Sequence, residues 1–172
     1  MSVSKLSIAF MAIALAALSA TAAFAVLDPG SGTSTPNGDF VFVPNQIGTA
    51  AIRVVKTADD SVVQTMNVIS GTPASMVTSP SGDTLFVVVT GATNSRVRAY
   101  SIDPTTGALT SVAYKTLSAS YTAGRQCALT PDGKYLYVAN FDNDATVGMS
   151  VYVLDVSNPS SMTVAGSFQV AN

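Results

Sequence analysis

A phrase of the form Ser/Thr-Pro-x-Gly, followed by a run of aromatic and β-branched residues, occurs three times in this 172-residue chain. Its prolines are Pro36, Pro80 and Pro131, which lie 44 and 51 residues apart. Proline presets φ for a tight turn and glycine accepts positive φ, so each copy predicts a turn. The residues that follow favour a β-strand. A period of this length indicates a repeat architecture with one small sheet per repeat, the repeats covering residues 35–78, 79–129 and 130–172.

The stretches between the turns predict further strands in the same order in each repeat. No strand pattern precedes Thr35, which leaves the first sheet with three strands in place of four. The predicted strands cover residues 40–44, 50–56, 62–69, 74–78, 85–90, 96–102, 109–116, 126–130, 135–139, 149–156 and 163–170.

The distribution of apolar residues predicts how each sheet is placed. Residues 40–43 and 85–89 are almost continuously apolar, so both faces of these strands should be covered and they should lie at the inner edge. Residues 62–68 are diluted by polar side chains and should lie nearer solvent. The predicted fold class is all-β, a partial β-propeller of about three four-stranded antiparallel blades. A β-sandwich also suits short, regularly spaced strands and remains the alternative.

Composition supports an all-β chain and excludes some partners. All ten acidic residues are aspartates, and Asp favours turns where Glu would favour helices. The net charge is −2 and the eight basic residues are spread along the chain, so no nucleic-acid partner is expected. Cys127 is the only cysteine, which excludes an intramolecular disulfide and predicts a buried, unreactive thiol.

The first 25 residues have the pattern of a secretory signal peptide. Lys5 gives a positive start, residues 6–18 form an apolar core, and Ala23-Phe24-Ala25 is a small-x-small cleavage site. The mature protein, residues 26–172, is then secreted or periplasmic and has no membrane contact. A membrane anchor is the alternative, because residues 6–27 are almost long enough to span a bilayer.

The repeats resemble those of a known family. Residues 131–140, Pro-Asp-Gly-Lys-Tyr-Leu-Tyr-Val-Ala-Asn, are similar to the repeat signature of the YVTN-type and lactonase-like β-propellers. Residues 42–80 resemble a YVTN blade, and residues 98–109 resemble the matching stretch of the 6-phosphogluconolactonase-like branch. Propellers of that family have about seven blades, and this chain has sequence for three. The resemblance therefore implies partner blades, either from a longer form of the same protein or from a second copy.

The resemblance also raises a sugar-lactone hydrolase function, of which this chain would be a fragment. Lactonases of this kind are thought to use polar and ionisable residues near the central channel, His and Glu among them. The chain contains neither residue, and no Ser–His–Asp or Cys–His arrangement is possible. No catalytic residue is predicted. The expected function is a binding or scaffold module, with the hydrolase as the alternative.

Candidate ligand residues lie in the loops after the apolar strands and in the links between repeats, which share one face of a propeller. These candidates are Gln46, Asn94, Tyr121, Arg125 and Asn143, and each could equally be an ordinary loop residue.

Two further groups of polar side chains suggest an interaction. Asn140, Asp142 and Asp144 alternate as oxygen ligands of Ca²⁺ do, although the terminal Glu of a calcium loop is missing. A solvated loop without a cofactor is favoured for this triplet. Arg96 and Arg98 share one strand face and are expected to pair with aspartates or to lie in solvent.

Overall fold

The computed structural model describes residues 31–46, 49–68, 71–92, 94–118, 123–141 and 149–170. These residues form twelve β-strands and one short 3₁₀-helix, η1 (Pro159–Ser161). Within these ranges no helix has the length and apolar character needed to cross a bilayer. The strands are β1 (Thr33–Ser34), β2 (Phe40–Asn45), β3 (Ala51–Lys56), β4 (Ser61–Asn67), β5 (Thr72–Thr78), β6 (Thr84–Thr90), β7 (Ser95–Ile102), β8 (Leu109–Ser118), β9 (Ala123–Leu129), β10 (Tyr135–Phe141), β11 (Met149–Asp155) and β12 (Thr163–Gln169).

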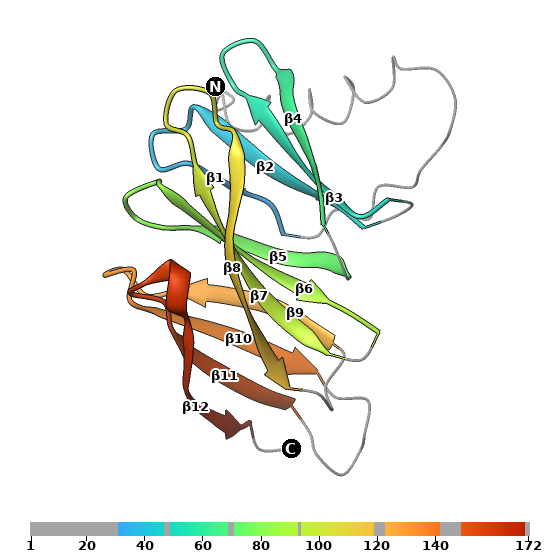
Figure 1. Ribbon diagram of the computed structural model, residues 1–172, viewed down its shortest axis with the longest axis vertical. Helices are drawn as coiled ribbons and strands as arrows, with labels where there is room; N and C mark the ends of the chain where they lie inside the picture. The colour runs from blue at the N-terminus through green and yellow to red at the C-terminus, as the bar shows by residue number, and fades with distance from the viewer. Residues whose placement is uncertain are drawn as a thin grey trace, which may run out of the picture.

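The strands form three four-stranded antiparallel sheets, each built from consecutive strands (Figure 1). The first sheet has the order β1-β2-β3-β4, the second β5-β6-β7-β8 and the third β9-β10-β11-β12. The predicted all-β partial propeller is therefore confirmed. Each sheet begins with the strand that precedes a Pro-x-Gly turn. The predicted repeats begin at the turn itself, so each sheet starts one strand before the predicted repeat.

The prediction of three strands in the first sheet is wrong. Thr33 and Ser34 form β1, which pairs with Phe42 and Val41 of β2. Two residues are too few to show a strand pattern in sequence. A neighbouring sheet supports β1, since Thr78 Oγ1 donates a hydrogen bond to the Ser34 carbonyl oxygen at 2.8 Å.

The strands that precede the turns, β1, β5 and β9, form the inner edges of the sheets and lie next to one another. Ser31 and Ser75 form a parallel bridge. The Cys127 amide donates a hydrogen bond to Ser75 Oγ at 3.2 Å, which joins β9 to β5. The expectation that the apolar strand is the inner edge is therefore wrong: β6 is second in its sheet. Small side chains such as Ser75 allow the inner strands of adjacent sheets to approach one another. The apolar strand β6 lies between two other strands, β5 and β7.

The three turns repeat the same hydrogen bonds. Gly38, Gly82 and Gly133 have φ of 79°, 78° and 73°, as the turn phrase predicts. Each glycine amide donates to the carbonyl oxygen three residues earlier, at 2.8–2.9 Å. The hydroxyl of the first turn residue then accepts from the amide of the following strand, at 3.0–3.1 Å; these hydroxyls belong to Thr35, Ser79 and Thr130.

The turns also stack on one another, along the left side of Figure 1. A Cβ added at Gly82 would lie 3.0 Å from Cδ of Pro36, and one at Gly133 would lie 3.2 Å from Cδ of Pro80. The glycine of each turn thus packs against the proline of the turn before it.

Two hydrophobic cores fill the spaces between the sheets. The first core, between the first and second sheets, contains Phe42, Ile52 and Val87 among its fully buried side chains. The second core, between the second and third sheets, contains Phe86 and Val138. Strand β6 supplies residues to both cores and is buried almost throughout, as its apolar sequence predicts. The outer strands β4 and β12 are mostly exposed, so the expected gradient of burial holds for these sheets.

A side-chain amide also joins the first two sheets. Gln64 on β4 donates from Nε2 to the Leu109 carbonyl oxygen at 3.2 Å. Its Oε1 accepts from the Leu109 amide at 2.7 Å. Both groups of the amide are therefore satisfied by the backbone of β8, and the outer strands of the two sheets are held together.

Candidate functional site

The face that carries the predicted ligand residues is called here the link face: the loops after the second strand of each sheet and the links between sheets. Tyr121 and Asn143 lie outside the described residues. Arg125 belongs to β9, and only its backbone is described. Of the five predicted ligand residues, Gln46 and Asn94 can be placed with their side chains.

Gln46 and Asn94 both have roles within the fold. Gln46 Nε2 donates a hydrogen bond to the Pro73 carbonyl oxygen at 3.0 Å and so joins the first sheet to the second. The Asn94 carbonyl oxygen accepts from the Gly91 amide at 2.9 Å and closes the loop after β6. The bond of Gln46 gives its side chain a structural role, whereas the bond of Asn94 is made by its backbone. The ligand role of all five residues stays a prediction.

Asn140, at the end of β10, has an unusual environment. Its side chain is fully buried, and neither its amide nitrogen nor its amide oxygen has a hydrogen-bond partner among the described residues. Ser150, directly opposite on β11, is also buried and its hydroxyl is likewise unpartnered. An unpaired polar group in the interior costs about 1–3 kcal/mol, so this corner of the third sheet is destabilising as it stands.

Asn140 is one of three residues predicted to bind calcium, and the other two, Asp142 and Asp144, lie outside the described residues. Within the described ranges, no three His, Cys, Asp or Glu side chains are grouped closely enough to hold a metal ion. The calcium site remains a prediction.

The opposite face, called here the turn face, carries a cavity of about 390 Å³ between the second and third sheets. The sequence alone does not reveal this cavity, although the repeated turns that form its rim are its clearest motif. Its lining residues include Pro80, Asp83 and Phe86 from the second sheet and Asp132, Gly133 and Pro159 from the third.

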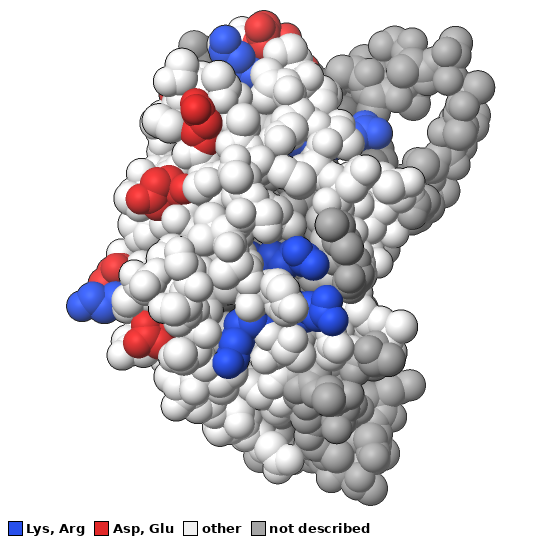
Figure 2. All heavy atoms as spheres, viewed as in Figure 1, with Lys and Arg blue, Asp and Glu red and all other residues white. Residues whose placement is uncertain are grey.

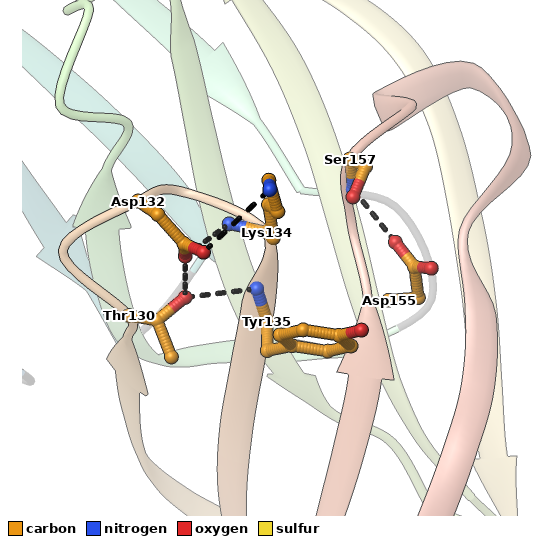
Figure 3. Close-up of polar contacts among 6 residues, drawn as sticks. All are labelled: Thr130, Asp132, Lys134, Tyr135, Asp155 and Ser157. Carbon is orange, nitrogen blue, oxygen red and sulfur yellow. Dashed lines mark hydrogen bonds and ion pairs between the residues drawn. The ribbon is translucent and has the colours of Figure 1, made fainter.

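The two cavity carboxylates are already hydrogen-bonded within their own turns. Asp132 accepts from the Thr130 hydroxyl at 2.6 Å and from the Lys134 amide at 3.1 Å (Figure 3). The Thr130 hydrogen bond contributes most to holding the pKa of Asp132 below its usual value. Burial raises the pKa of Asp83, but hydrogen bonds from neighbouring hydroxyls, Ser81 first, outweigh burial and lower it. A carboxylate with a lowered pKa is a weak general base, so both groups serve the turns.

A similar hydrogen bond supports the neighbouring turn of the third sheet. The Ser157 amide donates to Asp155 Oδ1 at 3.0 Å, and this bond lowers the pKa of Asp155 (Figure 3). Lys134 Nζ lies 4.0 Å from Asp132 Oδ2, with both side chains more than half exposed. An exposed pair at this distance contributes little to stability.

Cys127 is half-buried, which is less than the predicted full burial, and its thiol has the predicted low reactivity. The thiol lies 3.3 Å from Ser75 Oγ at the contact between β5 and β9. Burial raises the pKa of the Cys127 thiol, and the hydrogen bond with Ser75 only partly offsets this effect. A thiol with a raised pKa is a poor nucleophile, so Cys127 is a structural residue.

The pair Arg96 and Arg98 departs from expectation. Both are half-buried on β7 and lie over the ring of Tyr114 on β8, with their guanidinium carbons 5.4 and 5.5 Å from the ring centroid. The aromatic ring takes the place of the expected aspartate, because the direct cross-strand pairing of Arg98 with Tyr114 brings the ring within reach.

Comparisons with known proteins agree with this fold. The chain is similar to a proposed 6-phosphogluconolactonase from Bacteroides fragilis, with 24% identity and a TM-score of 0.66 over 83% of this chain and 39% of that one. It is similar to the periplasmic gluconolactonase of Pseudomonas aeruginosa, with 22% identity and a TM-score of 0.62 over 82% and 39%. The β-propeller domain of Cps50 from Myceliophteria thermophila has 12% identity and a TM-score of 0.61 over 82% and 43%.

The three sheets and the comparisons define the fold of this chain as a partial β-propeller. The chain spans about two-fifths of the length of the solved structures named above. The LVIVD repeat family matches residues 123–170, the region of the third sheet. No curated protein matches the sequence significantly.

Proposed function

We propose that this chain is an exported β-propeller repeat module that binds or scaffolds other molecules as part of a larger propeller. The observation that supports this proposal is the difference between equivalent positions in the three sheets. Phe42, Phe86 and Tyr137 occupy the same place after their turns. Phe42 and Phe86 are 0% and 1% exposed, whereas Tyr137 is 39% exposed. The first two are covered by the next sheet, and Tyr137 is where a further sheet would pack.

The end face is defined here as the exposed apolar side chains of the third sheet on the side of Tyr137, which are Tyr135, Tyr137 and Phe168. The outward side of the first sheet is similar, since Val41 and Val43 are half-buried where their second-sheet equivalents are fully buried. Apolar surfaces of this kind mark an interface or promote aggregation. Blades of a longer protein, or a second copy of this chain, would supply the cover.

Light scattering on the purified chain tests this proposal. We expect association that increases with protein concentration, because both terminal sheets present apolar faces. Tyr137→Ser should reduce association, whereas Tyr114→Ser should not, since Tyr114 is exposed on the second sheet, away from the end face. A folded chain that stays monomeric at all concentrations would show that three sheets are self-contained and would overturn the proposal.

Sugar-lactone hydrolysis is the second candidate, favoured by the names of two similar solved structures. We expect purified chain to hydrolyse glucono-lactone no faster than buffer, because no histidine or glutamate is present to act as a general base. The measurement is release of acid at constant pH. Turnover that is lost in Asp142→Asn would instead support an aspartate-based lactonase.

A further inference from the structure

Positive charge is concentrated over the second sheet on the face of the molecule seen in Figure 2. Figure 2 shows basic side chains gathered over the middle of one face of the molecule, in the region of β7 and β8, and acidic side chains along its left edge. Arg96 and Arg98 on β7 are the charged members whose contacts are described, and Tyr114 on β8 is the ring that both contact. The chain as a whole has a net charge of −2, so this concentration is local.

These two arginines lie on the side of the second sheet that faces the first sheet. Arg96 pairs with Val89 of β6 and Arg98 pairs with Val87, and both valines belong to the first core. Cross-strand partners project from the same side of a sheet, so the arginines continue that surface outward from the core. Tyr114 is 58% exposed, so a molecule from solvent can reach the ring and the groups beside it.

Arg96 has fewer partners than a half-buried arginine requires. Its Nε is buried and has no hydrogen-bond acceptor among the described residues. Arg96 forms no ion pair with a carboxylate anywhere in the described part of the chain; the ion pair found there joins Lys134 and Asp132 on the turn face. Arg98 is engaged differently, since it forms a side-chain hydrogen bond with Tyr100. Two guanidinium groups held against one ring repel each other, and an anion between them would relieve the repulsion.

The repeat architecture does not require an arginine at position 96. The equivalent positions, read from the pairing of the second and third strands, are Ala51 in the first sheet and Ser150 in the third. Small residues therefore suffice for the blade. A guanidinium presents two parallel N–H donors that match the two oxygens of a carboxylate or phosphate, and stacking on a ring fixes its plane.

We propose that Arg96, Arg98 and Tyr114 form an oxyanion-binding site for a small molecule that carries a carboxylate or phosphate group. Arg96 supplies the terminal N–H donors of its guanidinium group, Arg98 adds positive charge, and Tyr114 orients both guanidinium groups. All three residues belong to β7 and β8 of the second sheet.

Calorimetric titration of the purified protein tests the site, with inorganic phosphate in one arm and citrate in the other at matched ionic strength. Wild-type protein should bind at least one anion with a Kd of about 1 mM, and the arm with the tighter Kd identifies the preferred group. Arg96→Gln should weaken binding about tenfold, and Arg96→Lys should recover only part, because lysine keeps the charge without the paired donors.

Lys134→Gln is the matched control, since it removes the same charge from the turn face and should leave the Kd unchanged. Thermal midpoints of the variants establish that each is folded. If wild-type protein binds neither anion up to about 50 mM, or if Lys134→Gln and Arg96→Gln weaken binding equally, the site does not exist and the charge acts only as a diffuse field.

Discussion

Gly107→Ala is expected to lower the free energy of unfolding by about 3 kcal/mol, one of the largest effects of any single substitution in this chain. Gly107 ends the turn between β7 and β8 with φ of 72°, a conformation strained for any residue with a side chain. An added Cβ would also lie 2.5 Å from Cδ1 of Phe40, a ring that is 3% exposed and packed in the first core. Urea unfolding followed by circular dichroism measures the change.

Substitutions at two other glycines separate the effect of backbone strain from the effect of the contact with Phe40. Gly38→Ala has the same backbone strain, since its φ is 79°, but no atom lies within 4 Å of the added Cβ; we expect a loss of about 1 kcal/mol. Gly166→Ala has open space and no positive φ, and its effect should stay within about 0.5 kcal/mol. Equal losses for Gly38→Ala and Gly107→Ala would show that the contact with Phe40 is unimportant.

Phe86→Ala should destabilise the protein by about 3–5 kcal/mol, because it empties the centre of the second core. Phe86 is 1% exposed and packs between the second and third sheets. Phe168→Ala is the matched control: it removes the same atoms from a side chain that is 52% exposed, and should cost less than about 1 kcal/mol.

The measurement is the midpoint and slope of denaturant unfolding for both variants. Similar losses for Phe86→Ala and Phe168→Ala would mean that the two sheets do not pack through Phe86.

The order of strands was predictable because the turn signals and the apolar runs alternate regularly. All strands but β1 were identified from sequence, with boundaries that differ by a few residues at most. The positive φ of Gly82 and Gly133 followed from the turn phrase alone. Local chemistry decides these features: proline and glycine set the turn, and β-branched residues favour the strand.

The position of each strand within its sheet was harder to predict from the sequence, because it depends on contacts between repeats. Ser75 has no apolar pattern to mark an inner strand, yet its hydroxyl accepts from the Cys127 amide across two sheets. The hydrogen bond from the Gln46 side chain to the Pro73 carbonyl oxygen also joins residues that are distant in the sequence. The stacking of two arginines on Tyr114 requires the register of β7 against β8, which hydrophobic pattern alone does not specify.

The stack of turns determines how the protein responds to gain or loss of a whole sheet. Gly82 touches Pro36 and Gly133 touches Pro80, so the second and third turns each pack against the turn before them. Contacts of this kind between neighbouring units make stability close to a sum over units and their junctions. One more unit after the third sheet would place its glycine on the exposed Pro131 and leave every earlier junction intact. Deleting the second sheet would remove both cores together, because each core is built against it.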